Sequence, residues 1–266
     1  MSWLWAAFMP HPPIIVPEVG RGRERKASAT VEGMERLTKL LSEKRPDYLL
    51  VLSPHQPYAR NALFINRAPR LKGSLAPFGA HVSFEFYSSK KTYPLTEYLT
   101  TMGITVIEEN SPDLTQDHGT LVPLYFLRKI WRERGLVLPD MLLASPTGLG
   151  AEKSFQLGEA LASFDDELSW GFLASGDLSH SLTPDAPGGY SPSGPKFDAA
   201  VVAALSSVDP QELLALSPSE RGEARECGLC SAMAMLGLCR ALGRSIDVIS
   251  YEGPFGVGYC NALSLP

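Results

Sequence analysis

The chain has 266 residues, of which 44% are hydrophobic, 20% charged and 9% aromatic, a composition typical of a globular protein. Its 24 basic and 29 acidic residues give a net charge of −5, and no basic tract is long enough to follow a phosphate backbone. These features argue against a nucleic-acid partner. We expect a single domain over residues 1–266 and a small ligand.

The apolar run at residues 2–9 predicts a first strand. No charged segment precedes it, and Pro10, Pro12 and Pro13 interrupt it, which argues against a membrane span or a signal peptide. We therefore expect no membrane partner. Without a secretion signal, reduced thiols and a cytoplasmic location are the expectation for the four cysteines, Cys227, Cys230, Cys239 and Cys260.

The next elements predict a β-α-β unit. Apolar residues at near-helical spacing within residues 21–45 indicate an amphipathic helix, and the continuous apolar run at 47–52 indicates a buried strand. A right-handed crossover would make the strands at 2–9 and 47–52 parallel neighbours. Their carboxyl ends would then lie at the same edge of the sheet.

The alternation of strands and helices continues to the end of the chain. We predict strands near 63–66 and 82–86 with a break at Lys72-Gly73, and a polar loop over 108–119. Residues 183–194 form a predicted surface loop that could cover the site. Further strands are predicted at 104–107, 141–146, 170–176 and within 246–259, and helices at 92–102, 121–131, 155–164, 197–205 and 219–242. The pattern predicts an α/β fold with a central, mostly parallel or mixed sheet flanked by helices.

Four of the five histidines share one sequence context. His11, His55, His118 and His180 all lie in loops rich in proline, glycine, serine or aspartate, and three of them follow an apolar run. One such histidine alone is more often a structural or surface residue, because imidazole hydrogen-bonds readily to the backbone. Four in the same context indicate a shared site, whereas His81, which opens an alternating strand, is left out of it.

Two or more histidines with one carboxylate are the ligands of an open divalent-metal site. The 2-His-1-carboxylate triad of non-haem Fe(II) oxygenases leaves positions for substrate and O₂. Zinc hydrolases use similar ligands, so the ligand count leaves both open. Glu226 stands near the start of an otherwise apolar predicted helix, where a carboxylate requires a compensating cation or donor. Cys227 and Cys230 form a CxxC without a second pair, which favours packed thiols over a metal site.

Several separated motifs resemble the class III extradiol ring-cleavage dioxygenase superfamily. They cover residues 9–20, Ser53-Pro54-His55, residues 117–124, residues 176–180, Glu226-Cys227-Gly228 and residues 251–259. Within that superfamily the chain is most similar to the dioxygenase-like domain of the AmmeMemoRadiSam system, a relative of Memo proteins. The resemblance implies an α/β fold, a non-haem Fe(II), for which zinc could substitute in a preparation, and a catechol-type aromatic diol cleaved with O₂.

The resemblance also implies roles for individual residues. His11 and His55 match the two histidine ligands of the metal, and Glu226 falls on or next to the carboxylate ligand. His180 matches the acid/base histidine, and His118 matches a second pocket histidine. Asp117 and Asp177 are candidates for orienting the neighbouring histidines, with helix-cap or loop roles equally open.

The third ligand separates two functions. A carboxylate from Glu226 suits Fe(II), whereas a thiolate from Cys227, which Memo-like relatives have near this position, favours zinc or copper. We favour Glu226 and a dioxygenase. The alternatives are a Memo-like metal-binding protein without ring cleavage and a zinc hydrolase. Assembly into a homo-oligomer is left open.

Overall fold

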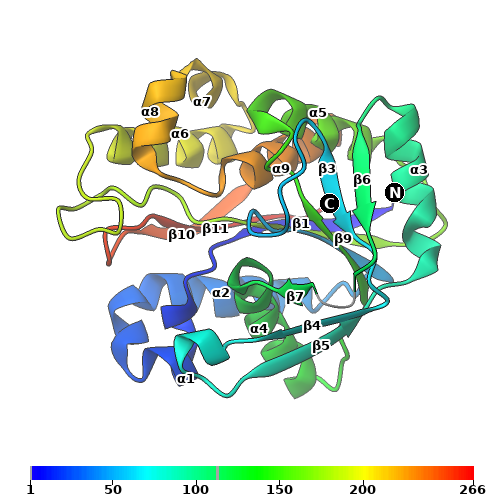
Figure 1. The fold of residues 1–266 in the computed structure, drawn as a ribbon, viewed down its shortest axis with the longest axis horizontal. Coiled ribbons are helices and arrows are strands. Elements are labelled where there is room, and N and C mark those ends of the chain that lie inside the picture. Colours follow the sequence, from blue (N-terminus) through cyan, green and yellow to red (C-terminus); the bar gives the residue numbers. More distant parts are fainter. Residues whose placement is uncertain (1, 112–113) are drawn as a thin grey trace.

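The computed structural model describes residues 2–111 and 114–266, which form a single α/β domain around one large mixed sheet (Figure 1). The order of its eight strands is β10-β11-β1-β9-β2-β8-β3-β6. A second, three-stranded sheet has the order β5-β4-β7. The predicted α/β fold with a mixed sheet flanked by helices is confirmed.

The strands of the large sheet are β1 (Trp3–Met9), β2 (Tyr48–Leu52), β3 (Leu63–Asn66), β6 (Val106–Glu109), β8 (Asp140–Ser145), β9 (Trp170–Ser175), β10 (Asp247–Glu252) and β11 (Tyr259–Ser264). Those of the small sheet are β4 (Arg70–Ser74), β5 (Ser83–Tyr87) and β7 (Thr115–Gln116). The helices are α1 (Pro17–Gly20), α2 (Ser28–Leu41), α3 (Tyr93–Thr101), α4 (His118–Glu133), α5 (Gly150–Ala162), α6 (Ser193–Ser207), α7 (Gln211–Ala215), α8 (Pro218–Ala224) and α9 (Leu229–Ala241).

The centre of the large sheet is parallel. Strands β1, β9, β2 and β8 run in one direction, with β9 between β1 and β2. The expectation that β1 and β2 are neighbours is therefore wrong, because a strand from much later in the chain is inserted between them. Both still end at the same edge of the sheet. All five residues of β2 are buried, as expected of a strand that is covered on both faces.

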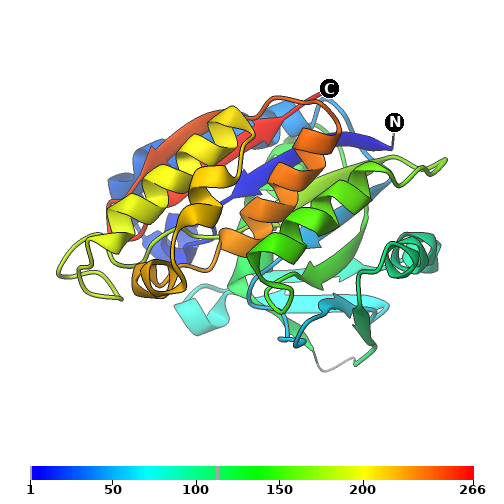
Figure 2. The ribbon, with the colours of Figure 1, turned by 90° about the horizontal axis from the view of Figure 1, so that it is seen from above.

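Two hydrophobic cores cover the two faces of the sheet. Leu50 and Leu52 of β2 point to the face that carries α5, α6 and α9, whereas Leu49 and Val51 point to the face that carries α2 and α4 (Figures 1 and 2). This alternation follows from the two-residue period of a strand. Both faces of the strands are thus occupied by packed side chains, and only the strand ends are available for a site.

Helices α5 and α9 lie close together on the first face. A Cβ atom at Gly158 would overlap the carbonyl oxygen of Ala234, and one at Gly237 would overlap that of Phe155. Glycine at these two positions lets the helix backbones approach each other. The contact fixes α9, and with it the segment that precedes α9 and carries Glu226 and Cys227.

Three local predictions need correction. The predicted break at Lys72-Gly73 lies inside β4, because the strand pairs with β5 on one side and β7 on the other. The predicted loop 108–119 includes residues of β6, β7 and the first turn of α4. The predicted single helix over 219–242 is two helices, α8 and α9, separated at Arg225, which has a positive φ of 51°. Residues 183–192 form a loop, and α6 begins at Ser193.

Candidate metal centre

His11 lies just beyond the carboxyl end of β1 and is almost completely buried. The Ser175 hydroxyl donates to the carbonyl oxygen of Gly119 (2.5 Å), and Ser175 Oγ lies 2.8 Å from His11 Nδ1. Since the single hydroxyl hydrogen is used on Gly119, His11 Nδ1 must donate to Ser175. His11 therefore carries its hydrogen on Nδ1, and Nε2 has a free lone pair.

His55 follows β2 at the same edge of the sheet, and its Nε2 lies 3.1 Å from His11 Nε2. Burial lowers the pKa of His11 well below its usual value, and the neighbouring histidines lower it further. Burial also lowers the pKa of His55, although Asp117 opposes that shift. Both rings are thus disposed to be neutral at pH 7, which is the form that binds a metal.

His118 is the first residue of α4 and not a loop residue as predicted. Asp117 precedes it as the helix N-cap, where its carboxylate accepts a hydrogen bond from the Thr120 N–H at 3.0 Å. The His118 ring stacks on His55 with centroids 4.6 Å apart, and its pKa is lowered by burial to about 4. Ligand nitrogens of His11, His55 and His118 all lie within 4.8 Å of one another, so the three can share one metal ion.

His180 lies in the loop after β9, held by two backbone bonds. Its N–H donates to the carbonyl oxygen of Ala224 (2.9 Å), and its own carbonyl oxygen accepts from Gly188 (2.8 Å). Burial lowers the pKa of His180, and Nδ1 is buried without a hydrogen-bond partner among residues 2–111 and 114–266. The charge of His180 would lower the pKa of both His11 and His118, so the ring belongs to the same electrostatic environment.

Glu226 lies in the break between α8 and α9. Its Oε2 accepts a hydrogen bond from the N–H of Leu229, the first residue of α9, at 2.6 Å. Burial raises the pKa of the carboxyl group to about 7. A helix N-terminus supplies the donor that this carboxylate requires, so burial by itself does not demand a metal. The assignment of Glu226 as the third ligand stays a prediction.

Cys227 lies close to the histidines, although its isolated CxxC motif favoured a packed thiol. Its Sγ lies 3.4 Å from His11 Nε2, and burial raises the pKa of the thiol well above its usual value. Both Cys227 and Cys230 are free thiols. A metal would be needed to hold Cys227 as a thiolate here, because the surroundings favour the neutral thiol.

The two candidate orienting carboxylates accept hydrogen bonds from backbone N–H groups and from a hydroxyl near the histidines. Asp177 Oδ1 accepts a hydrogen bond from the His11 N–H at 2.8 Å, and Asp117 also accepts from the Ser53 hydroxyl at 2.8 Å. They fix the chain segments that carry the histidines. Ser175 and Ser53 were missed from the sequence, although each is a small polar residue at or just after the end of a buried strand.

The comparisons with known proteins identify the family and the fold of the chain. A sequence model described as "Catalytic LigB subunit of aromatic ring-opening dioxygenase" matches residues 5–261. The chain belongs to this LigB family. Membership supports a dioxygenase-like enzyme, and the resemblance to the class III extradiol superfamily is confirmed at that level.

One sequence relative and one solved structure are informative. The chain is 32% identical over 263 residues to "Protein CA_C1420" of Clostridium acetobutylicum, covering 95% of this chain but 55% of that protein, so it spans about half of the relative's length. The crystal structure of the uncharacterized protein JW3007 from Escherichia coli K12 aligns with a TM-score of 0.65 at 17% identity, over 98% of this chain and 99% of that one. The second comparison shows the fold alone. Among the described residues, no helix is long and apolar enough to cross a membrane.

Proposed function

We propose that this LigB-family chain is a non-haem Fe(II) dioxygenase that opens the ring of a catechol-type aromatic diol with O₂. The observation that carries the proposal is the approach of His11 Nε2 and His55 Nε2 to 3.1 Å at the carboxyl edge of the sheet. Two nitrogens that each lie about 2.1 Å from one metal at roughly 90–110° are about 3.0–3.4 Å apart. The spacing and the free lone pair on His11 fit a divalent metal.

A metal bound there would bring the two oxygens of the diol and O₂ together. The protein's own contribution is the placement of its neutral imidazoles. His180, with its pKa lowered, would accept a proton from a substrate hydroxyl at Nδ1 and return it later. His118 stacks beside His55 and is close enough to join the metal ligands, but in this proposal it faces the bound diol or O₂, as the family resemblance implies.

The third ligand comes from Glu226 or Cys227 in this proposal. Glu226 completes the facial triad of an oxygenase. Cys227 Sγ, at 3.4 Å from His11 Nε2, favours a second candidate function, a Memo-like metal-binding protein without ring cleavage. A thiolate would make the site softer and more suited to zinc or copper.

The test compares Glu226→Ala with Cys227→Ala after anaerobic reconstitution with Fe(II). Bound iron is measured by elemental analysis, and ring opening is followed by the absorbance of the product when a panel of catechols and air are added. Iron loss in the glutamate variant alone, with ring opening by the parent, is the expected result. Iron loss in the cysteine variant alone, with no ring opening by the iron-loaded parent, would replace the dioxygenase by the second candidate.

A further inference from the structure

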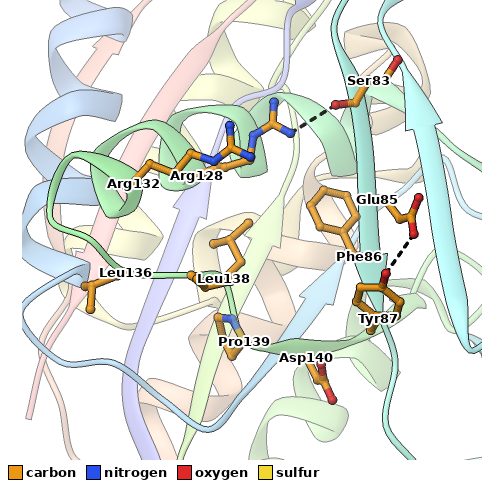
Figure 3. A pocket seen from close by; sticks show the side chains of 11 residues that line it. Ser83, Glu85, Phe86, Tyr87, Arg128, Arg132, Leu136, Leu138, Pro139 and Asp140 are labelled. Atoms are coloured by element: carbon orange, nitrogen blue, oxygen red, sulfur yellow. Dashed lines mark hydrogen bonds between the residues drawn. The ribbon is translucent and has the colours of Figure 1, made fainter.

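A cavity of about 440 Å³ is lined by residues of β5, α4 and the start of β8 (Figure 3). It lies at the opposite edge of the sheet from the histidines, which follow the carboxyl ends of the strands. Its walls come from β5, from the last turns of α4, and from the segment 136–140 that leads into the amino end of β8. The volume is within the range of ligand-binding pockets. The metal centre uses none of the residues that line it.

One wall of this cavity is an unpaired strand edge. In the β4–β5 pair, Leu75 donates to the carbonyl oxygen of Val82, and Ser88 donates to that of Pro69. The hydrogen-bonded positions of an antiparallel strand alternate, so the even-numbered residues of β5 bond to β4 and the odd-numbered residues point away from it. Among the described strands, β5 pairs with β4 alone.

The contact between Arg128 and Ser83 confirms this register. Arg128 Nη1 donates to the carbonyl oxygen of Ser83 at 3.1 Å, which requires that this oxygen face the cavity and not β4. The backbone groups of Glu85 and Tyr87 therefore also face the cavity. They present two N–H and two C=O groups to whatever occupies it.

The opposite wall is positively charged at one end. Arg128 and Arg132 are one helical turn apart on α4, and both side chains lie at the Ser83 end of the cavity (Figure 3). Neither forms an ion pair among the described residues. Burial and the charge of Arg132 lower the pKa of Arg128, although Tyr125 and Glu18 oppose the shift, so the two guanidinium groups repel each other. An anionic group between them would relieve that repulsion.

The floor and rim between these walls are apolar. Phe86 is buried below the cavity, whereas Val137 is 71% exposed and Tyr87 is 53% exposed at its rim. Leu136 and Leu138 complete this surface. Two acidic residues, Glu85 and Asp140, also line the cavity, and Glu85 forms an ion pair with Arg70. An occupant therefore meets backbone hydrogen-bonding groups, an apolar surface and, at one end, the two guanidinium groups, which have no ion-pair partner among the described residues.

We propose that this cavity binds an extended segment of a partner protein, which adds a strand to the outer edge of β5 and places an acidic side chain between Arg128 and Arg132. Strand addition would pair the outward backbone groups of Glu85 and Tyr87, for which the described part of the chain supplies no partner, and would cover the apolar surface beside them. Residues 83–87 span about 13 Å at roughly 3.3 Å per residue, so about four residues of the partner would pair. A small aromatic carboxylate would use the arginines but leave the strand edge unpaired.

The test uses fluorescein-labelled hexapeptides of alternating valine and threonine that carry two glutamates at one end. Two such peptides, with the glutamates at the amino or the carboxyl end, allow for either strand direction, and a peptide with lysines in their place is the control. Binding to the full chain is measured by fluorescence anisotropy. We expect at least one acidic peptide to bind more than about fivefold more tightly than the lysine peptide.

Substitutions distinguish strand addition from simple anion binding. Arg132→Gln should weaken binding about three- to tenfold, while Arg134→Gln, the same charge change on an exposed residue outside the cavity, should not. Tyr87→Pro removes the outward N–H without removing a bond to β4, and Tyr87→Ala retains that N–H. The proline variant should bind about five- to tenfold more weakly than the alanine variant.

Amide hydrogen exchange of the parent protein gives a readout that does not depend on any variant folding. The N–H groups of Glu85 and Tyr87 should exchange more slowly when the acidic peptide is bound. Equal affinity for acidic and lysine peptides, or unchanged exchange at these two amides, would overturn the proposal. If Arg132→Gln weakens binding but Tyr87→Pro and Tyr87→Ala bind equally, the cavity is a small-anion site and strand addition is wrong.

Discussion

The two edges of the large sheet carry sites of opposite character. At the carboxyl edge, His11, His55 and His118 bring their ligand nitrogens within 4.8 Å of one another, and their pKa values are all lowered. At the amino edge, a cavity of about 440 Å³ combines apolar side chains with two arginines. A search for a functional site by cavity volume would select the amino edge. The side chains capable of acid/base and metal chemistry, however, lie at the carboxyl edge.

This difference follows from how parallel strands end. The strands β1, β2 and β9 deliver His11, His55 and Asp177 to one edge, since each is followed directly by a polar loop. The amino edge receives the loop after α4, which brings leucine, valine and proline from 136–139. The carboxyl edge therefore holds a few polar side chains in fixed positions, whereas the amino edge leaves space for a larger ligand.

The largest expected effect is on metal binding at the carboxyl edge. His11→Ala should lower the affinity for Fe(II) by about 10³-fold or more, because even the loss of a residue that supports a ligand costs 10–100-fold. Anaerobic iron titration with elemental analysis measures the change. His81→Ala, at an exposed histidine, is the matched control and should retain iron. Full iron retention by His11→Ala would exclude this residue as a ligand.

His180→Ala should separate catalysis from metal binding. We expect turnover of a catechol to fall by about 10²–10⁴-fold while iron content stays unchanged, since His180 acts on substrate protons and not on the metal. Steady-state rates and iron content are measured on the same preparation. A loss of iron in this variant would instead identify His180 as a ligand.

Ser175→Ala tests how the tautomer of His11 is fixed. Without the hydroxyl oxygen that accepts from His11 Nδ1, the affinity for Fe(II) should fall by about 10–100-fold. Ser145→Ala, at the end of the parallel strand β8, removes a buried hydroxyl that bonds to Thr147 and should leave iron binding unchanged. Equal affinities in the two variants would mean that Ser175 does not orient the ring.

Gly237→Ala should weaken the packing of α9 on α5 and thereby the anchoring of the segment that carries Glu226 and Cys227. The added methyl group would overlap the carbonyl oxygen of Phe155 and force α9 away from α5, so the free energy of unfolding should fall by about 1–3 kcal/mol. Gly222→Ala, with open space around its Cβ position in α8, is the control and should be neutral or stabilising. Chemical denaturation measures both. A fully stable Gly237→Ala protein would show that the two helices can separate freely.

Asp198 gives the smallest effect and a dependence on pH. Its carboxylate accepts hydrogen bonds from the Ser179 N–H (2.7 Å) and the Tyr251 hydroxyl (2.7 Å), which fixes the loop that carries His180. Burial raises its pKa to about 6. As the pH rises, the Asp198 carboxyl group of the unfolded chain, with a pKa near 3.8, loses its proton first. The folded protein holds this proton up to about pH 6.

The stability that this proton contributes is complete below about pH 4 and is lost as the pH rises through about 6. Relative to Asp198→Asn, the parent should lose about 1–2 kcal/mol of unfolding free energy between these values. Urea denaturation at pH 4, 5, 6 and 7 measures the difference. Parallel curves for the two proteins would contradict the raised pKa.

Much of the site could be read from the sequence because it depends on local patterns. Each buried strand is a short apolar run, and a polar residue directly after such a run lies at a strand end wherever the strand is placed. This reasoning found His11, His55 and His180. The prediction that these residues lie at one edge of the sheet is correct even though β9 is inserted between β1 and β2, because all three strands are parallel.

Predictions that relied on long-range packing were less secure. Arg70–Ser74 is a strand because β5 and β7 pair with it. Its own residues do not compensate for the low strand propensity of Gly73, so the sequence predicted a break there. Glu226 was assigned to a metal because a buried carboxylate needs a partner, but the start of α9 already supplies one. The thiol of Cys227 reaches His11 across 216 residues of sequence, a contact that no local pattern contains.

The sequence by itself therefore determined the α/β class, the family and the set of histidines, because apolar periodicity and the residues at strand ends are local properties. Only the tertiary structure decided the order of the strands, the hydrogen on His11 Nδ1, the approach of Cys227 to His11, and the outward-facing edge of β5. Each of these depends on which distant segments meet. These tertiary contacts depend on the packing of the whole chain, because side chains far apart in sequence compete for the same space and the same hydrogen-bond partners.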